Sequence, residues 1–258
     1  AGPLNNLSPP IAYWTFDELT VNSTVAPDAR GRHDGTVVGA TLTTGGLGRF
    51  GEALSFDGDD DYMIAGVIEE LRTPDAFTIS VWFFREVDHA AAENATKHNV
   101  NNVLIAQASD ASNDNLEFGT EENSIEVFVK TEAAGGREAE FTQAATVTDN
   151  QWHHLVVSYD STAENELKFY LDGDLVGERS KSGGFVVDNV ASPFTIGLSR
   201  PEGSAQGDFE GRIDDVAVWD TALDQSHVSG LFSGTSPLEL SGYAYHLGLD
   251  LQAEMFNQ

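Results

Sequence analysis

A long succession of short strand-like segments constrains the fold of this chain more than any other sequence feature. These segments alternate apolar and polar residues, or consist of β-branched and aromatic residues, and Gly- and Asp-rich turns separate them. The strongest segment is FTISVWFF at 77–84, an unbroken run of such residues. Many short strands with frequent turns predict an all-β chain whose two antiparallel sheets form a β-sandwich of jelly-roll type.

The expected strands cover most of the chain. They lie at 11–16, 29–38 (where a loop runs into a strand), 52–58, 61–66, 77–84, 103–108, 116–120, 124–130, 139–145, 151–160, 167–173, 174–180, 193–199 and 211–219. We expect 52–58 and 61–66 to be the two arms of a hairpin around an acidic turn. One segment, 223–233, has its apolar residues at helical spacing, so the sequence predicts one short helix near the C-terminus.

The expected strands also suggest how the chain is organised. Residues 86–102 are polar and rich in Ala and Asn, which is typical of a long surface insertion between two strands. We therefore expect an N-terminal extension at 1–10, a sandwich at 11–235 that carries this insertion, and a C-terminal extension at 236–258.

The charge balance is strongly acidic. The chain has 42 Asp and Glu residues against 13 Lys and Arg residues, which gives a formal net charge of -29. Such a field repels nucleic acid and anionic membranes and attracts cations. No apolar run reaches the length of a membrane-spanning helix, no secretory signal pattern is recognisable at the start, and no Cys is present. We therefore expect neither nucleic-acid binding, nor membrane insertion, nor disulfide bonds.

Two adjacent carboxylates interrupt the segment GRIDDVAVW at 211–219. Strict alternation places Ile213, Asp215 and Trp219 on one face of this strand and Asp214 on the other. The segment is otherwise apolar enough to be buried on both faces, and a buried carboxylate is costly unless it is paired or coordinates a metal. Because basic partners are scarce, a cation with oxygen ligands, calcium in particular, is the favoured solution.

Eight short motifs occur in a recognisable order. They are AYWTFDE at 12–18, PDARGRHDGT at 27–36, FGEALSFDGDDDYM at 50–63, FTISVWF at 77–83, QWHHLVVSYD at 151–160, LKFYLDGDLVG at 167–177, FTIG at 194–197 and GRIDDVAVWDTAL at 211–223. In this order they resemble a laminin G-like jelly-roll domain of the concanavalin A-like lectin and glucanase superfamily. The resemblance covers roughly residues 11–235. The insertion at 86–102 and the tail after Pro237 depart from the family pattern.

The resemblance implies a structural calcium ion that ties the N-terminal segment to the last long strand. The residues that match the family's ligand positions are Asp17, Asp28 and Asp214 or Asp215. Calcium takes 6 to 8 oxygen ligands, and such an ion would close a large loop and stabilise the folded state. The alternative is that Asp17 and Asp28 are turn residues and that Asp214 pairs with Arg212 or with a backbone amide.

A second acidic cluster, Asp57 and Asp59–Asp61, has D-x-D-x-D spacing. It lacks the glycine at the sixth position of a helix-loop-helix calcium loop, where Tyr62 stands, and the acid at the twelfth, where Ile68 stands. We interpret it as a solvated turn.

The aromatic and histidine residues favour a core role. Trp14, Trp82, Trp152 and Trp219 all fall in expected strands. If a glycan binds, better candidates lie in the variable segments: His89, Lys97, His98, Asn101, Arg137, Tyr159, Arg200 and Glu202. His153 and His154 are neighbours on a strand and point to opposite faces, so they do not chelate one ion together. We expect one of them to be buried and the other to face solvent.

The superfamily includes enzymes as well as binding modules, and glucanases of this fold carry E-x-D-x-x-E or E-x-D-x-E on one strand. Neither motif occurs here: between Glu138 and Glu140 stands Ala139, and Glu117 and Glu126 lie on separate segments. The favoured function is a non-catalytic, calcium-stabilised carbohydrate-binding or adhesion module of a secreted or cell-surface bacterial protein. Its expected partners are polysaccharides or glycoconjugates, and cell-surface proteins. Two alternatives stay open: a polysaccharide hydrolase or lyase of the same fold, and a protein-interaction domain of a surface assembly.

Overall fold

A computed structural model describes residues 7–20, 23–88, 102–108, 116–130, 138–180, 192–199 and 209–240. Its strands are β1 (Ala12–Trp14), β2 (Val25–Ala26), β3 (Gly35–Val38), β4 (Thr41–Leu42), β5 (Leu54–Asp57), β6 (Tyr62–Ile64), β7 (Ala76–Val87), β8 (Val103–Gln107), β9 (Leu116–Glu121), β10 (Ser124–Lys130), β11 (Glu138–Ala144), β12 (Trp152–Asp160), β13 (Leu167–Leu171), β14 (Asp174–Arg179), β15 (Phe194–Ile196) and β16 (Glu210–Trp219). A short 3-10 helix η1 (Glu69–Leu71) and the α-helix α2 (Gln225–Phe232) complete these elements.

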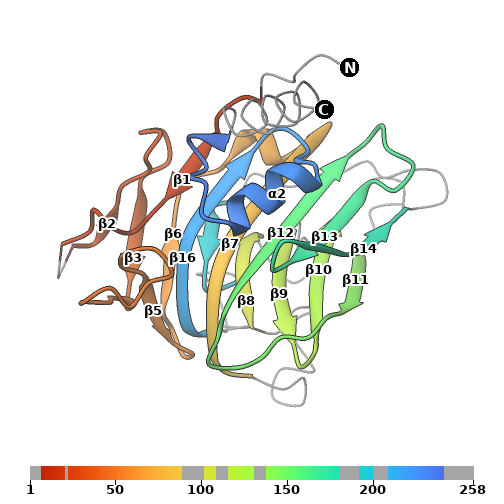
Figure 1. Cartoon of the computed structure of the whole chain (residues 1–258). Coiled ribbons are helices and arrows are strands. Elements are labelled where there is room, and N and C mark those ends of the chain that lie inside the picture. The colour runs from red at the N-terminus through yellow and green to blue at the C-terminus, as the bar shows by residue number, and fades with distance from the viewer. Residues whose placement is uncertain are drawn as a thin grey trace, which may run out of the picture.

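The strands form two antiparallel sheets that face each other (Figure 1). The helix-side sheet has the order β14-β13-β12-β7-β16-β5-β4, and β1 pairs with β16 beside it. The opposite sheet has the order β11-β10-β9-β8-β15-β6-β3-β2. The predicted two-sheet β-sandwich is therefore confirmed, and so is the short helix, since α2 lies within the expected segment 223–233.

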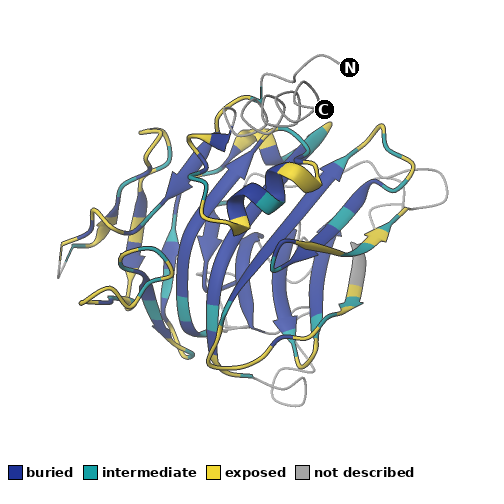
Figure 2. Ribbon diagram, in the orientation of Figure 1, coloured by how far each residue is buried: buried dark blue, intermediate teal, exposed yellow. Residues whose placement is uncertain are grey.

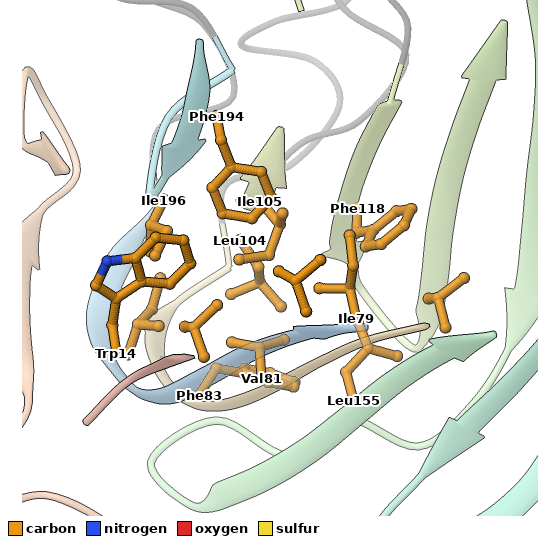
Figure 3. Close-up of a cluster of buried hydrophobic side chains, with 14 of the residues drawn as sticks. Trp14, Ile79, Val81, Phe83, Leu104, Ile105, Phe118, Leu155, Phe194 and Ile196 are labelled. Carbon is orange, nitrogen blue, oxygen red and sulfur yellow. The ribbon is translucent and has the colours of Figure 1, made fainter. Parts of the chain in front are cut away.

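The core lies between the two sheets (Figures 2 and 3). Trp14 of β1 stacks on Phe194 of β15 with ring centroids 5.5 Å apart, so the first strand packs directly against the opposite sheet. Ile79 and Phe83 from β7 meet Phe118 from β9 in the same cluster, and all five side chains are at most 1% exposed. Burial of a side chain of this size contributes roughly 1.5–3 kcal/mol.

A β-bulge breaks the expected alternation along β16. The register against β7 shifts between Asp214 and Ala217, and Asp215 at the bulge has φ +47°. Ile213 therefore shares the inter-sheet core with Val216, whereas Trp219 packs on the outer side of the sheet. The prediction that Ile213 and Trp219 lie on one face was wrong, because strict alternation does not allow for the extra residue.

The acidic turn after β5 does not close a hairpin, contrary to expectation. β5 pairs with β16 and β4 in the helix-side sheet, whereas β6 pairs with β3 and β15 in the opposite sheet. The chain therefore crosses from one sheet to the other at Gly58–Asp61. Two neighbouring strand segments joined by a short turn predict a hairpin on local grounds, and only the pairing partners of each strand separate the two cases.

The helix α2 lies across part of the outer face of the helix-side sheet (Figure 1). The Asp224 side chain accepts hydrogen bonds from the backbone N–H groups of Ser226 and His227 and so caps the helix at its N-terminus. Val228 and Leu231 pack in the outer cluster with Tyr13, Trp219 and other buried residues of the sheet.

Two residues beyond the predicted sandwich bounds also join the outer cluster: Leu240 is fully buried in it, and Leu7 packs against it. The predicted domain bounds remain predictions. Residues 1–6 of the N-terminal extension, 241–258 of the C-terminal extension and 89–101 of the insertion lie outside the described residues. Within the described part of the chain, neither helix has the length and apolar character needed to cross a bilayer.

Candidate functional site

A pocket of about 200 Å³ opens where β1, β7 and β16 meet the end of α2. Its walls combine acidic, aromatic and small side chains: Tyr13, Asp17, Phe50, Ser80, Trp82, Asp215, Leu231 and the segment Gly234–Pro237. This pocket lies on the outer face of the helix-side sheet, because Trp82 and Ser80 point away from the inter-sheet core. It therefore combines aromatic surface with convergent polar groups, as small-ligand sites do.

Trp82 stands in a stack of planar groups. The His154 ring, one strand away in register, stacks on it with centroids 4.6 Å apart, and Phe232 of α2 stacks on it at 5.7 Å. The Arg49 guanidinium lies 4.4 Å from the centroid of the Trp82 ring and 4.7 Å from that of Phe50. These contacts leave Trp82 only 3% exposed, so the indole forms the floor of the pocket.

Asp214 and Asp215 both lie on the helix side of β16. Asp214 is opposite Trp82 in the β-ladder, and residues opposite each other share a face; Asp215 lines the pocket. The Tyr13 hydroxyl donates a hydrogen bond to Asp215 Oδ1. Burial raises the pKa of both carboxyls, and for Asp214 the neighbouring charge of Asp215 raises it further. The pair is therefore electrostatically suited to hold a proton or a cation.

The backbone supplies most of the partners of Asp214. Its Oδ2 accepts the N–H groups of Arg49 at 2.8 Å and Phe50 at 3.0 Å, and its Oδ1 accepts the N–H of Asp215 at 2.8 Å. Of roughly four lone-pair positions on a carboxylate, these bonds use three. Asp214 thus fixes the loop that carries Arg49 and Phe50 onto the sheet.

Asp17 reaches the pocket from the segment that follows β1. Its Oδ1 accepts the backbone N–H of Glu52 at 2.8 Å, while the side chain stays exposed. Gly51 makes room for it: a Cβ on Gly51, whose φ is +75°, would lie 2.0 Å from Asp17 Oδ1. Asp17 therefore retains oxygen lone pairs that face the pocket, close enough to Asp215 for its charge to raise the pKa of that carboxyl.

Asp28 lies in a separate arrangement. Its two oxygens accept four backbone N–H groups, from Tyr13, Arg30, Arg32 and His33, at 2.8–3.0 Å. These four bonds use all the lone pairs of the carboxylate, and they attach the loop after β2 to β1. The structure thus brings Asp17 and Asp215 together, with Asp214 behind them, and places Asp28 apart. In this conformation Asp28 would not ligate a cation, and its assignment remains a prediction.

The sequence profile of the concanavalin A-like lectin/glucanases superfamily matches residues 56–229, more than half of the chain. The chain belongs to this superfamily. The resemblance based on the eight motifs is therefore confirmed, and the matched region holds most of the helix-side sheet. No curated protein matches the sequence.

Several solved structures are similar to this concanavalin A-like domain. Domain 4 of AbnA, an extracellular GH43 arabinanase from Geobacillus stearothermophilus in complex with arabinotriose, has 17% identity and a TM-score of 0.61; the match covers 86% of this chain and 98% of that domain. The binding domain of Paraclostridial Mosquitocidal Protein 1 has 17% identity and a TM-score of 0.64, over 87% of this chain. The ligand-binding domain of botulinum neurotoxin serotype D, in complex with N-acetylneuraminic acid, has 12% identity and a TM-score of 0.61, over 87% of this chain. The match spans only about half of each toxin chain. At these identities the likeness shows the fold.

The other predicted residues of this concanavalin A-like domain have mixed outcomes. His153 and His154 point to opposite faces as predicted, but both are buried, so the expectation of a solvent-facing histidine was wrong. His153 bonds Asp172 at 2.8 Å, an interaction that raises the pKa of His153 against the effect of its burial. His154 Nε2 bonds the Ser80 hydroxyl at 2.8 Å, and burial lowers its pKa to about 3. The reason is that β12 is covered on both faces at these two residues, by the opposite sheet at His153 and by Phe232 of α2 at His154.

The tryptophans differ in how far they are buried. Trp14 and Trp219 are fully buried as predicted, and Trp152 is half-buried. Tyr159, a glycan candidate, is 1% exposed in the inter-sheet core and stacks near Phe77 at 5.4 Å, so that assignment was wrong. The other glycan candidates lie outside the described residues: His89, Lys97, His98, Asn101, Arg137, Arg200 and Glu202.

The pocket residues that sequence reasoning missed are Tyr13, Phe50, Ser80 and Trp82. Tyr13, Ser80 and Trp82 sit in expected strands, and Phe50 begins the motif at 50–63. A signal was present, since Ser80 and Trp82 share one face of β7 while Ile79, Val81 and Phe83 share the other. A serine beside a tryptophan on the second face indicates a surface that is covered but not entirely apolar.

The acidic turn after β5 stands apart from this pocket. Among the residues that the structure describes, Asp57, Asp60 and Asp61 are the one group of three potential ligands whose oxygens all lie within 4.8 Å of one another. Desolvation raises the pKa of Asp61, opposed by the N–H of Asp57 and reinforced by the charges of its neighbours. Exposed acidic groups of this kind are common without an ion, and we assign no cation to it.

Proposed function

We propose that this chain is a non-catalytic, calcium-stabilised carbohydrate-binding or adhesion module of a secreted or cell-surface protein. The observation that carries the proposal is the pocket on the helix-side sheet. Sugar-binding sites combine aromatic surface with a few polar groups, and this pocket offers Phe50 and Trp82 together with Asp17, Ser80 and Asp215. Its volume of about 200 Å³ suits a single sugar ring.

The similar structures support this proposal by their ligands. The arabinanase domain was solved with arabinotriose, and the neurotoxin domain with N-acetylneuraminic acid. The arabinanase in the first description is extracellular, which supports a secreted or cell-surface location here. Because identities are 12–17%, these structures do not fix the sugar that this chain would bind.

The chemistry of the carboxylates supports a cation in the pocket. Asp17 and Asp215 have free oxygen lone pairs on the same cavity, and Asp214 has one more beside them. A divalent ion there would neutralise charges that burial disfavours and would link the segment after β1 to β16. We propose Asp17 and Asp215 as side-chain ligands, with Asp214 behind them holding the Arg49 loop.

Binding to a glycan array in the presence of calcium tests the carbohydrate proposal. We expect the full chain to bind at least one polysaccharide, and Phe50→Ala to weaken binding about tenfold by removing a half-buried aromatic wall. Leu175→Ala, which removes an exposed apolar side chain on the distant β14, is the matched control and should bind like the parent chain. Absence of binding across polysaccharides of plant, algal and bacterial origin contradicts the proposal.

One observation favours the enzymatic alternative. Glu117 on β9 and Glu126 on β10 share the outer face of the opposite sheet, since Glu126 is opposite Gly119, two residues from Glu117. Both are buried, and the Ser199 hydroxyl donates to Glu117. The Cα atoms of diagonal neighbours of this kind lie roughly 7–8 Å apart. Their carboxyl groups can therefore reach the separation found between paired glycosidase carboxylates. Release of new reducing ends from a polysaccharide, abolished by Glu117→Gln, would establish catalysis and displace the binding-module proposal.

A further inference from the structure

A second row of planar side chains crosses the helix-side sheet beside the pocket. Trp152 on β12, Phe84 on β7 and Arg212 on β16 are opposite one another in register. The Arg212 guanidinium lies 3.8 Å from the centroid of the Phe84 ring, and Trp152 meets Phe84 edge-on with centroids 5.7 Å apart. We call these three residues the outer row.

The outer row is uncovered, unlike the row beneath α2. Trp82 and His154 are buried under Phe232, whereas Trp152, Phe84 and Arg212 are all half-buried. Trp152 is the one tryptophan of the four that retains appreciable exposure. Two partly exposed aromatic side chains on a sheet surface offer a ligand rigid apolar area, and binding there costs little side-chain entropy.

The outer row lies next to the loop that forms one wall of the pocket. Phe84 is two residues from Trp82 on the same face of β7, a rise of roughly 7 Å. Arg212 donates a hydrogen bond from Nη1 to the Leu47 carbonyl at 3.0 Å, within the loop whose Phe50 lines the pocket. A ligand that leaves the pocket over Phe50 would cross this loop, whose Arg49 lies on Trp82, and would then reach the outer row.

We propose that the outer row extends the pocket into one elongated site, and that its occupant is an uncharged polysaccharide chain several sugar units long. This inference rests on the carbohydrate-binding function proposed above and adds to it the class of ligand. The pocket holds one ring, and Trp152 stacks with a ring further along the same chain, beside Phe84 and Arg212. The module would thus recognise internal stretches of a polymer rather than a single terminal sugar.

Charge favours an uncharged ligand over a charged one. Arg212 Nε lies 3.5 Å from Glu86 Oε1, so the row carries a donor and an acceptor whose charges cancel. The net charge of -29 acts against polyanions at long range, and the single guanidinium of the row is already partnered. Sugar hydroxyls can accept from Arg212 and donate to Glu86 without requiring a net charge.

Titration of the full chain with linear neutral oligosaccharides of two to six units tests this inference, with arabino-oligosaccharides first and then the series from any polysaccharide bound on the array. We expect affinity to rise with length, and Trp152→Ala to lower hexasaccharide affinity about tenfold while leaving the disaccharide unchanged. Trp152→Phe, which keeps an aromatic ring, should retain the length dependence. The emission of Trp152 should shift when the hexasaccharide binds, and this shift should be lost in Trp152→Phe.

The outcomes separate the two proposals. If no saccharide binds, the carbohydrate function itself is wrong. If saccharides bind with an affinity that is independent of length, or if Trp152→Ala retains the length dependence, the pocket acts alone and the extended site is wrong. A parent chain that is dimeric and becomes monomeric on Trp152→Ala would assign the row to a second copy of the chain. Arg212→Gln is the second variant, to be used with the same titration if Trp152→Ala loses its native circular dichroism.

Discussion

At the scale of single residues, Tyr13 links two of the predicted metal ligands. Its backbone N–H donates to Asp28, and its hydroxyl donates to Asp215. Burial first, and then the Asp215 charge, raise the pKa of Tyr13 above its usual range, so the hydroxyl is protonated and can donate at neutral pH. One side chain thus couples the loop after β2 to the bulge in β16.

Tyr13→Phe tests this link. Removing the hydroxyl leaves Asp215 without its donor, and we expect a loss of about 1–2 kcal/mol in the free energy of unfolding. Urea denaturation measures it. Tyr62→Phe removes a half-buried hydroxyl for which the described residues provide no hydrogen-bond partner, and should change stability by less than about 0.5 kcal/mol. Equal effects of the two variants would mean that the bond to Asp215 contributes nothing.

Gly51 offers a second test at this scale, with a matched control in the same loop. Gly51 and Gly45 have φ values of +75° and +86°, but a Cβ would lie 2.0 Å from Asp17 Oδ1 only at Gly51; at Gly45 it meets no atom within 4 Å. Gly45→Ala should therefore show backbone strain alone, about 1 kcal/mol, and Gly51→Ala more than that because Asp17 must move. The same variant should weaken calcium binding, as measured by calorimetry. If the two variants are alike in both measurements, the position of Asp17 does not matter.

At the scale of elements, the strands could be predicted from the sequence and their partners could not. The run at 77–84 and the segment at 151–160 became β7 and β12 because composition and alternation are local properties. The bulge in β16 and the crossing after β5 depend on which strands lie alongside, and no local pattern encodes this. The candidate site illustrates the same limit: Asp17 and Asp215 were named in advance, whereas Phe50, Ser80 and Trp82 belong to it because of how α2 and the Arg49 loop pack on the sheet.

The capping of α2 is an element-scale feature with a direct test. The Asp224 side chain accepts N–H bonds at 2.9 and 3.0 Å from the first turn of a helix only eight residues long. Asp224→Ala should cost about 1 kcal/mol and loosen the cover over Trp82, which thermal melting and tryptophan emission would report. Asp220→Ala, an exposed acid in the turn before the helix, is the control with the same loss of charge. Unchanged melting of Asp224→Ala would show that α2 is held by packing alone.

At the scale of the whole molecule, the buried acid pair makes stability depend on pH and on divalent ions. Burial raises the pKa of Asp214 and Asp215, so above pH about 4, the ordinary value of the group, the unfolded chain releases protons that the folded chain retains. The contribution of the pair is therefore fully present below pH 4 and is lost as pH rises toward neutrality. A cation bound at the pair replaces the proton and should reverse this trend.

Thermal unfolding between pH 4 and pH 8, in EDTA and in calcium, measures both effects. In EDTA we expect the melting temperature of the parent chain to fall as pH rises. The double variant Asp214→Asn/Asp215→Asn should show a smaller fall, because it lacks the titrating pair. Calcium at 100 times its dissociation constant should add about 2.7 kcal/mol near pH 8 and little near pH 4. Asp57→Asn, in the exposed acidic turn, should respond to calcium like the parent. A melting temperature that calcium does not change at pH 8 would eliminate the proposed ion.

The pairing of the first strand with the last has a consequence for how the molecule is made. Ala12 pairs with Val218, so β1 and β16 can pair only after nearly the whole domain has left the ribosome. This pairing joins strands that are far apart in the sequence, and contacts at such a long sequence separation slow folding. An ion bound by Asp17 and Asp215 would therefore stabilise the domain after these two strands have paired, and it would not help to start folding.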